Sequence, residues 1–460
     1  MRTFGHPDTA IIVAMVALYI VFTAWLTARS RSRTASEFMV GGRSLPATVV
    51  GILMLSEFIG AKSTIGTAQG AYESGMAASW AVLSAAVAFP LFGLFMARKL
   101  YNTGEFTISG AIFKRYGRAT QLIVSLIMIY ALLLVNVGNY ISGAASIAVV
   151  LQVDLPVAAT VIAIVSTFYF AFGGMKSLAY VNLLHSGVKY LGIFVVLGVA
   201  LHLCGGLAPV MQTLPAAYFT WDGQLGGATI AAYFIGTIGS VFSTQYIIQA
   251  ISSTASADAA RRSTFIAAAL AIPVSLALGL IGVAARYLYP QLDSLYALPV
   301  FLQGMNVYMA GFVSVALVAS IFISVSTVAL AIASLVVRDF YVPYWRPGAE
   351  REFVTTRRLA VAIGFLPLLF VFVAPGLLQL SFFTRALRLS ISIVAMIGFY
   401  LPFFASNRGA SCGLLASAVA TTVWYVLDNP YGIDNMYIAL VLPAIVILID
   451  KLFHWRPARI

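Results

Sequence analysis

Long runs of apolar residues, separated by short polar stretches, follow one another along the whole chain. Each run is long enough for a helix to cross a bilayer, which takes about 20 residues. None shows the alternation over about 10 residues that marks a membrane β-strand. The pattern therefore predicts an all-α polytopic membrane protein with about thirteen transmembrane helices. The expected spans lie near 12–36, 46–72, 78–98, 121–151, 156–172, 180–204, 228–250, 263–287, 310–336, 357–373, 378–404, 409–427 and 433–453.

Two of these spans are interrupted by small and polar residues. Residues 46–72 contain four glycines and residues 228–250 contain two, in both cases mixed with Ser, Thr and Gln. Each glycine weakens a helix by about 1 kcal/mol relative to alanine. Interrupted spans at corresponding positions of two halves indicate the midplane binding site of a secondary transporter. Close helix packing through small residues is the alternative interpretation.

Composition and charge sharpen this interpretation. Of the 460 residues, 61% are hydrophobic and only 9% are charged, whereas soluble domains carry about 25% charged residues. This balance excludes a soluble enzyme, a nucleic-acid binder and a disordered chain. Most of the 27 Lys and Arg residues fall in alternate loops and in the C-terminal tail. The positive-inside rule then places the N-terminus outside and the C-terminus in the cytoplasm, and we expect a bacterial cytoplasmic (inner) membrane.

The few remaining polar residues argue against catalysis. The four histidines and the two cysteines are scattered, and the carboxylates do not cluster in the spans. A metal site or an activated nucleophile would need such groups close together. We therefore predict a protein that is not an enzyme and has no cofactor other than a coupling ion, sodium or a proton. Its expected partners are the lipid bilayer and a small organic solute, not nucleic acid, and the sequence sets no oligomeric state.

Five short stretches, in order along the chain, resemble the sodium:solute symporter family. They are the Gly-Arg stretch at 36–44, the Gly-to-Tyr stretch at 66–72, the Gly-Gly-x-Lys loop at 172–180, the end of the seventh helix at 245–249 and the end of the ninth at 338–341. The resemblance implies the leucine-transporter fold, with a leading helix and loop at 1–45. It also implies a 5+5 inverted repeat at 46–204 and 205–404, followed by two trailing helices and a cytoplasmic tail at 405–460.

The resemblance also implies an ion site. Its sodium ligands map onto the carbonyls of Ser56 and Ile59 and onto Ser320, Ile323 and Ser324. The family usually has a hydroxyl where this chain has Ile323, and an isoleucine side chain cannot coordinate a cation.

Basic residues lie close to the position of the missing aspartate in the sequence. Asn182 replaces an aspartate that the family places on the sodium path, and Lys189 lies about two turns later on the same helix face, with His185 between them. Lys189, with His185 and Glu57, could therefore replace sodium by a proton or by a permanent cation. Alternatively, Lys189 snorkels or pairs with Glu57 while sodium binds through the carbonyls.

The same resemblance places the solute between the two interrupted spans. The sugar-carrying branch has a tyrosine and an asparagine where this chain has Ser240 and Thr237, which disfavours a sugar. Lys62 offers a cation to a solute carboxylate, unless it serves as an internal partner of Glu57. Arg385 and Arg388, near the start of a span, are expected to snorkel to the interface, with an anion funnel as the alternative. The candidate lining residues are Lys62, Ser63, Thr64, Thr237, Ser240 and Thr244.

The predicted function is secondary active import of a small organic solute by alternating access, coupled to a cation. A carboxylate or an amino acid is the favoured solute. One alternative is a sodium-independent carrier, driven by protons, by exchange or uncoupled, in which Lys189 replaces the sodium. An alternative of another class is a membrane solute sensor.

Overall fold

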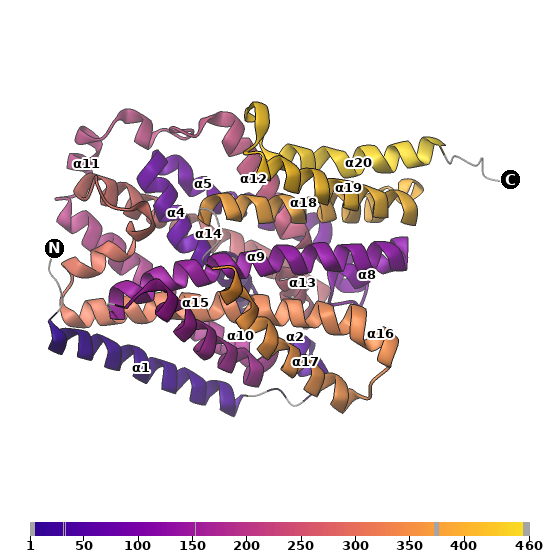
Figure 1. The fold of residues 1–460 in the computed structure, drawn as a ribbon, viewed down its shortest axis with the longest axis horizontal. Coiled ribbons are helices and arrows are strands. Elements are labelled where there is room, and N and C mark those ends of the chain that lie inside the picture. Colours follow the sequence, from indigo (N-terminus) through magenta and orange to yellow (C-terminus); the bar gives the residue numbers. More distant parts are fainter. Residues whose placement is uncertain (1–4, 31, 33, 152, 372–376, 454–460) are drawn as a thin grey trace.

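The described chain is built of helices that run mostly along one axis (Figure 1). The computed structural model describes residues 5–453 except 31, 33, 152 and 372–376. Within these residues no strand forms, and the only bridge joins Leu45 to Thr254. The helices of the first half are α1 (His6–Arg29), α2 (Ala35–Val40), α3 (Ala47–Phe58), α4 (Ala61–Ser74), α5 (Trp80–Leu83), α6 (Ala85–Phe92), α7 (Arg98–Asn102), α8 (Ile108–Tyr116), α9 (Arg118–Leu151) and α10 (Leu155–Leu203).

The second half continues the same architecture. Its helices are α11 (Leu207–Thr213), α12 (Gly226–Ser243), α13 (Gln245–Ser252), α14 (Ala257–Leu288), α15 (Val307–Leu335), α16 (Val342–Trp345), α17 (Ala349–Phe365), α18 (Leu377–Tyr400), α19 (Asn407–Val426) and α20 (Asn435–Phe453). Ten described segments are long and apolar enough to cross a membrane, and two shorter apolar helices, Ala47–Phe58 and Leu155–Phe168, accompany them. The all-α polytopic prediction is confirmed.

Several predicted boundaries are wrong in detail. The leading helix, expected at 12–36, runs from His6 to Arg29. The spans expected at 156–172 and 180–204 form α10, which bends at Gly174, where φ is 65°. A β-carbon at Gly174 would press against the backbone of Phe38, so this position favours glycine. The span expected at 357–373 is only partly described, because its end lies among the residues outside the described ranges.

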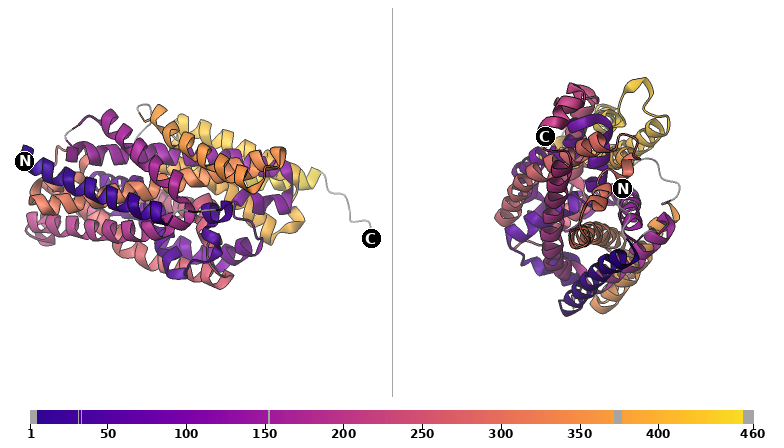
Figure 2. Two further views of the ribbon diagram at one scale, coloured as in Figure 1. Left: turned by 90° about the horizontal axis from the view of Figure 1, so that it is seen from below. Right: turned by 90° about the vertical axis from the view of Figure 1, so that its left-hand side faces the viewer.

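Helix α15 forms the centre of the bundle. Its most apolar stretch is completely buried, and it packs against α1, α9, α10 and α17. Helix α1 begins near one end of the long axis and α20 ends near the other (Figures 1 and 2). The predicted repeat boundaries at 46–204 and 205–404 stay a prediction.

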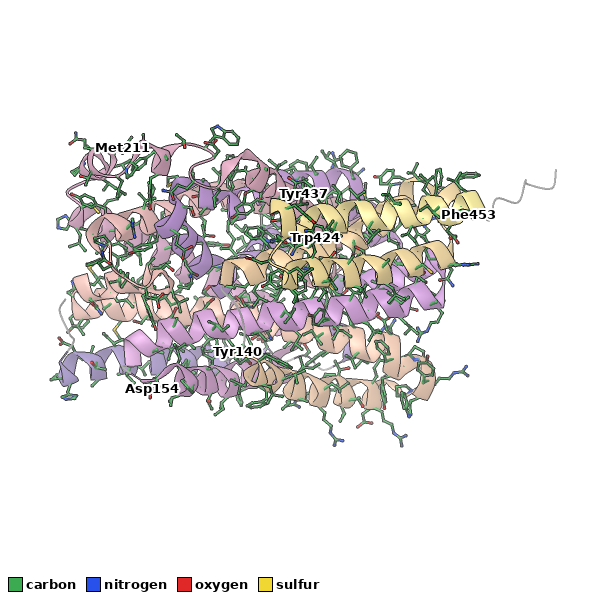
Figure 3. All side chains as sticks on the ribbon, turned by 45° about the horizontal axis from the view of Figure 1, so that its top comes forward. Tyr140, Asp154, Met211, Trp424, Tyr437 and Phe453 are labelled. Carbon is green, nitrogen blue, oxygen red and sulfur yellow. The ribbon has the colours of Figure 1, made fainter. Side chains whose placement is uncertain are left out.

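The outer surface of the bundle is rich in exposed hydrocarbon side chains (Figure 3). Leu18, Leu191 and Val419 expose 70%, 61% and 63% of their surface. Soluble proteins rarely expose contiguous apolar areas of this kind. These faces are therefore suited to contact with lipid.

Two helices break inside the bundle, in the two spans that the sequence marked as interrupted. α3 ends at Phe58 and α4 begins at Ala61, with Ile59 and Gly60 in non-helical conformations. α12 ends at Ser243 and α13 begins at Gln245, after the extended residue Thr244. A helix end leaves its last carbonyls without intrahelical partners, so each break exposes polar backbone in the interior.

Candidate functional site

The carbonyls freed at the α3 break point toward a lysine of α10. The ammonium Nζ of Lys189 donates hydrogen bonds to the carbonyl oxygens of Ser56, at 3.1 Å, and Ile59, at 3.0 Å. Lys189 is 1% exposed, and its ammonium also lies 4.9 Å from the ring centre of Tyr190. These are the two carbonyls that the sequence resemblance gave to the ion site. In this structure an ammonium of the protein itself binds them.

The residues of α15 predicted for the ion site lie close to the same break. Ser324 is in close contact with Gly60, where a β-carbon would collide with its hydroxyl. The Ser324 hydroxyl donates to the carbonyl of Ser320 at 2.7 Å, while the buried Ser320 hydroxyl has no hydrogen-bond partner among the described residues. Ile323 is fully buried and brings no oxygen. The α15 side of the site is therefore poor in ligands that face a cation.

The other residues proposed beside Lys189 have separate surroundings. His185 Nδ1 is 2.5 Å from the hydroxyl oxygen of Tyr19 on α1, so His185 links α10 to the leading helix. Asn182 is buried, and its Nδ2 has no hydrogen-bond partner in the part of the chain that the structure describes. Glu57 is electrostatically coupled to Lys189, but the two form no salt bridge within the described residues. The pairing of Lys189 with Glu57 considered from the sequence is therefore absent in this state.

A small cavity lies between the two breaks. Its volume is about 20 Å³, room for about one water molecule. Helices α3, α4, α9, α13 and α18 supply its walls. The lining residues are Glu57, Phe58, Gly60, Lys62, Ser63, Val135, Asn139, Tyr246, Arg385 and Arg388.

Lys62 faces this cavity at the start of α4. Its side chain is 5% exposed, and its ammonium has neither a hydrogen bond nor a salt bridge among the described residues. Gly138 of α9 makes room for it, because a β-carbon there would collide with the Lys62 side chain. The internal pairing of Lys62 with Glu57, considered from the sequence, is not formed.

Arg385 and Arg388 also belong to this cavity, and the expectation that they snorkel to the interface is wrong. Each is 4% exposed. Arg385 Nη1 donates to Thr237 Oγ1 at 2.9 Å, and Arg388 Nη1 donates to Thr244 Oγ1 at 2.8 Å. The packing of α12 against α18 thus turns both guanidinium groups inward. The signal available in the sequence was two arginines one turn apart inside a span, which are functional candidates by default.

The remaining predicted solute residues differ in role. Ser63 lines the cavity, although its hydroxyl donates to the Phe58 carbonyl at 3.1 Å. The Thr64 hydroxyl donates to Gly60 and the Ser240 hydroxyl to Thr237, both carbonyls of their own helices. Thr237 and Thr244 accept hydrogen bonds from Arg385 and Arg388 and do not line the cavity themselves. Of the six predicted residues, only Lys62 and Ser63 therefore line the cavity directly.

An aromatic layer lies beside the cavity. The guanidinium of Arg385 is 5.5 Å from the ring centre of Phe58 and 5.2 Å from that of Phe382. Phe382 in turn stacks on Tyr233, with ring centres 4.0 Å apart and planes 11° from parallel. Phe58 and Phe382 therefore flank Arg385.

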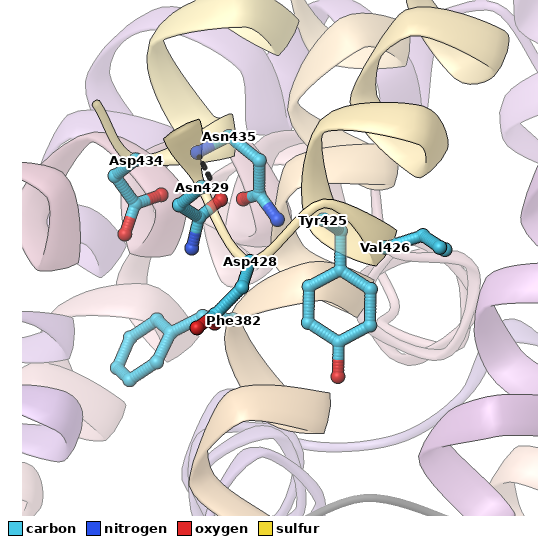
Figure 4. A pocket seen from close by; sticks show the side chains of 7 residues that line it. All are labelled: Phe382, Tyr425, Val426, Asp428, Asn429, Asp434 and Asn435. Atoms are coloured by element: carbon cyan, nitrogen blue, oxygen red, sulfur yellow. Dashed lines mark hydrogen bonds between the residues drawn. The ribbon is translucent and has the colours of Figure 1, made fainter. Parts of the chain in front are cut away.

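A second pocket is lined by Phe382 of this aromatic layer and lies where α18 meets the turn between α19 and α20 (Figure 4). It holds about 320 Å³ and presents Asp428 and Asp434, with Asn429 accepting a hydrogen bond from the backbone of Asn435. Burial raises the pKa of the Asp434 carboxyl. No motif in the sequence predicts this pocket. Its carboxylates set it apart from the cation-lined cavity.

Comparisons with known proteins agree with this architecture. The model of the sodium:solute symporter family matches residues 38–383. The human sodium/iodide cotransporter is 28% identical over 45% of this chain and 33% of its own length. The human high affinity choline transporter 1 is 24% identical over 76% of this chain and 66% of its own. The Vibrio parahaemolyticus sodium/glucose cotransporter is 22% identical over 97% of this chain and 90% of its own.

Solved structures share the fold at low sequence identity. A Na⁺-coupled sialic acid symporter, in a substrate-bound outward-open state, superposes with a TM-score of 0.83 at 18% identity, covering 98% of both chains. A nucleobase-cation-symport-1 family transporter in a closed conformation gives a TM-score of 0.62 at 16% identity, over 90% of this chain and 95% of the other. The described helices therefore form a known transporter architecture.

Proposed function

Because the chain belongs to the sodium:solute symporter family, we propose that it is a secondary transporter that imports a small organic anion by alternating access. A carboxylate or an amino acid is the favoured solute. One observation carries this proposal: Lys62, Arg385 and Arg388 line the same buried cavity at the two helix breaks. Transport of a solute fits this family, and no enzymatic reaction is proposed.

The chemistry of the cavity supports an anion. Buried charges are costly unless they are paired, and in the described chain none of these three cations forms a salt bridge. Guanidinium and ammonium groups bind carboxylates through short charge-assisted hydrogen bonds. A bound carboxylate would therefore satisfy groups that the protein leaves without a charged partner.

We further propose that the Lys189 ammonium holds the position of the family's sodium ion, which makes transport independent of sodium. Its two hydrogen bonds to the Ser56 and Ile59 carbonyls support this proposal, as does the apolar side chain of Ile323. Under this scheme the carrier is driven by protons, by solute exchange or by the solute gradient alone.

Sodium coupling is the second candidate, and a separate observation favours it. The names of the sodium/iodide and sodium/glucose relatives state sodium as the coupled ion. In this scheme Lys189 must leave the two carbonyls before sodium can bind them. The two candidates therefore differ in whether sodium and the Lys189 ammonium compete.

Uptake into proteoliposomes tests both parts. Radiolabelled succinate, lactate, alanine and glucose are offered to the purified protein under a sodium gradient alone, a pH gradient alone, or neither. Uptake of an acid but not of glucose, equal with and without sodium, is the expected result. Uptake of glucose alone would contradict the anion proposal. Strict sodium dependence that persists in Lys189→Ala would contradict the proposed role of Lys189.

The orientation in the membrane is also a proposal. We infer an N-terminus outside and a C-terminus in the cytoplasm of a bacterial inner membrane, because basic residues concentrate in alternate loops. In a Cys412→Ser background, an impermeant maleimide added to intact cells should label Tyr431→Cys. It should not label Glu350→Cys until the cells are opened. The reverse labelling would contradict this orientation.

A further inference from the structure

The charges that line the cavity do not balance. Lys62, Arg385 and Arg388 contribute three positive charges, and Glu57 contributes the one carboxylate of the lining. With these groups in their usual ionised forms, the cavity carries an excess of two positive charges. Lys189 is left out of this count because it does not line the cavity; its hydrogen bonds to two neutral carbonyls leave its own charge in place.

Contacts inside the protein leave this excess in place. The hydrogen bonds of the two guanidinium groups go to neutral acceptors, namely the Thr237, Thr244 and Tyr246 hydroxyls and the Thr384 carbonyl. Both carboxylate oxygens of Glu57 are buried without a hydrogen-bond partner in the described chain, although Thr327 lies beside it. Unpaired buried charges of this kind strongly destabilise a protein unless another charge approaches them.

The cations come from two different elements. Arg385 and Arg388 lie one turn apart on α18, whereas Lys62 begins α4 beside the break. The threonines that anchor the two guanidinium groups are seven residues apart in sequence, about 10 Å along a helix. All three cations interact electrostatically with one another. The three positive charges thus reach the cavity from two separate helices, α4 and α18.

We propose that the solute carries two carboxylates, one bound by the arginine pair of α18 and the other by Lys62. This inference rests on the proposed function and names the class of solute: a short dicarboxylate, with or without an amino group. Two carboxylates supply the two negative charges that the lining lacks. Guanidinium groups suit the first carboxylate because their planar donors match its two oxygens.

Ligands that differ by one charge test the proposal on the unmodified protein. Thermal unfolding and competition with labelled succinate uptake are measured with succinate, with its monoamide succinamate, and with butyrate. Succinate should compete at concentrations at least about tenfold lower than succinamate, because one charged hydrogen-bonding group is lost. Aspartate is measured in the same way to test whether an added amino group is tolerated. Both succinate and aspartate are dicarboxylates and fit the proposal.

The possible outcomes separate the two levels of the proposal. Equal competition by succinate, succinamate and butyrate would overturn the two-carboxylate inference while leaving an anion carrier. Competition by neutral sugars and by none of the acids would overturn the proposed function itself. A preference for succinate over both other acids supports both.

Variants then assign the charges. Arg388→Gln and Lys62→Gln should each reduce the preference for succinate over succinamate toward one, since each removes a partner of one carboxylate. The exposed residues Arg358 and Lys99 provide matched controls, and Arg358→Gln and Lys99→Gln should keep the preference. An unchanged preference in a correctly folded Arg388→Gln would overturn the assignment. If a variant does not fold, the series on the unmodified protein still decides.

Discussion

Two buried lysines lie at the same helix break and have opposite surroundings. Lys189 donates to two carbonyls that the break sets free, whereas the Lys62 ammonium has no acceptor in the described chain. Both are 5% exposed or less. Burial alone therefore does not distinguish a cation held by the protein from one that is available to a ligand. The difference appears only when each hydrogen-bond partner is identified.

Removing the Lys62 charge should have the largest effect on transport. We expect Lys62→Met to lower succinate uptake by about 100-fold, because truncating one partner of a buried charge pair typically costs 2–5 kcal/mol. Thermal stability should hold or rise, since an unpaired buried charge is lost. Uptake into proteoliposomes and thermal melting measure the two effects. Lys99→Met is the matched control on an exposed lysine. Unchanged uptake in Lys62→Met would show that the Lys62 ammonium does not bind the solute and would remove the contrast with Lys189.

Removing Lys189 should instead affect stability first. Lys189→Ala leaves two buried carbonyls without a donor, which costs about 1–3 kcal/mol for each unsatisfied group. We expect a lower melting temperature for this variant and partial rescue by sodium, since a cation could then bind the carbonyls. Melting curves with sodium chloride and with choline chloride measure this rescue. Equal stabilisation of the unmodified protein by sodium would show that the site is open to the ion while Lys189 is present.

The threonine anchors should matter less than the charges they hold. Thr237→Val keeps the shape of the side chain but removes the acceptor for Arg385 Nη1. Loss of one hydrogen bond to a charged group costs about 1.5–3 kcal/mol, so we expect succinate affinity to fall by about tenfold or slightly more. Competition assays measure it, with Thr422→Val on α19 as the control. An effect as large as that of Lys62→Met would mean that Thr237 contacts the solute itself.

The smallest effect is expected at Ser320. Its hydroxyl has no hydrogen-bond partner among the described residues, and Lys189 already binds the nearby carbonyls. Ser320→Ala should therefore leave stability unchanged or raise it slightly, because a buried hydroxyl without a partner is removed, and it should leave uptake unchanged. Measurements with and without sodium check this expectation. A sodium-dependent loss of uptake would identify Ser320 as an ion ligand and favour the sodium-coupled candidate.

The sequence predicted much of the fold because lipid imposes a simple rule on it. Helices that face hydrocarbon must be apolar for about 20 residues, and the two glycine-rich spans that violate this rule are the two that break. The position of Lys189 relative to Ser56 and Ile59 followed from the family motifs. None of these inferences needed side-chain packing.

The parts that could not be predicted depend on contacts between distant helices. Arg385 and Arg388 lie near the start of a predicted span, where snorkelling is common, and only the packing of α12 against α18 turns them inward. His185 faces Tyr19 of α1, a contact 166 residues apart in sequence. Hydropathy gives the approximate depth of a residue in the membrane, but it does not give the direction of its side chain.

The cation that binds the Ser56 and Ile59 carbonyls is covalently attached to the chain. A dissolved ion can enter on one side and leave on the other, and so transfer the energy of its own gradient to a solute. Lys189 stays with the protein through the whole cycle, so it cannot transfer the energy of a sodium gradient in this way. A dianion that enters alone against a potential of 100 mV, negative inside, then faces a cost of about 4.6 kcal/mol, at about 2.3 kcal/mol for each charge. Exchange for another dianion removes that electrical cost. Counter-transport is therefore the cycle that requires the least electrical work when the cation is part of the chain.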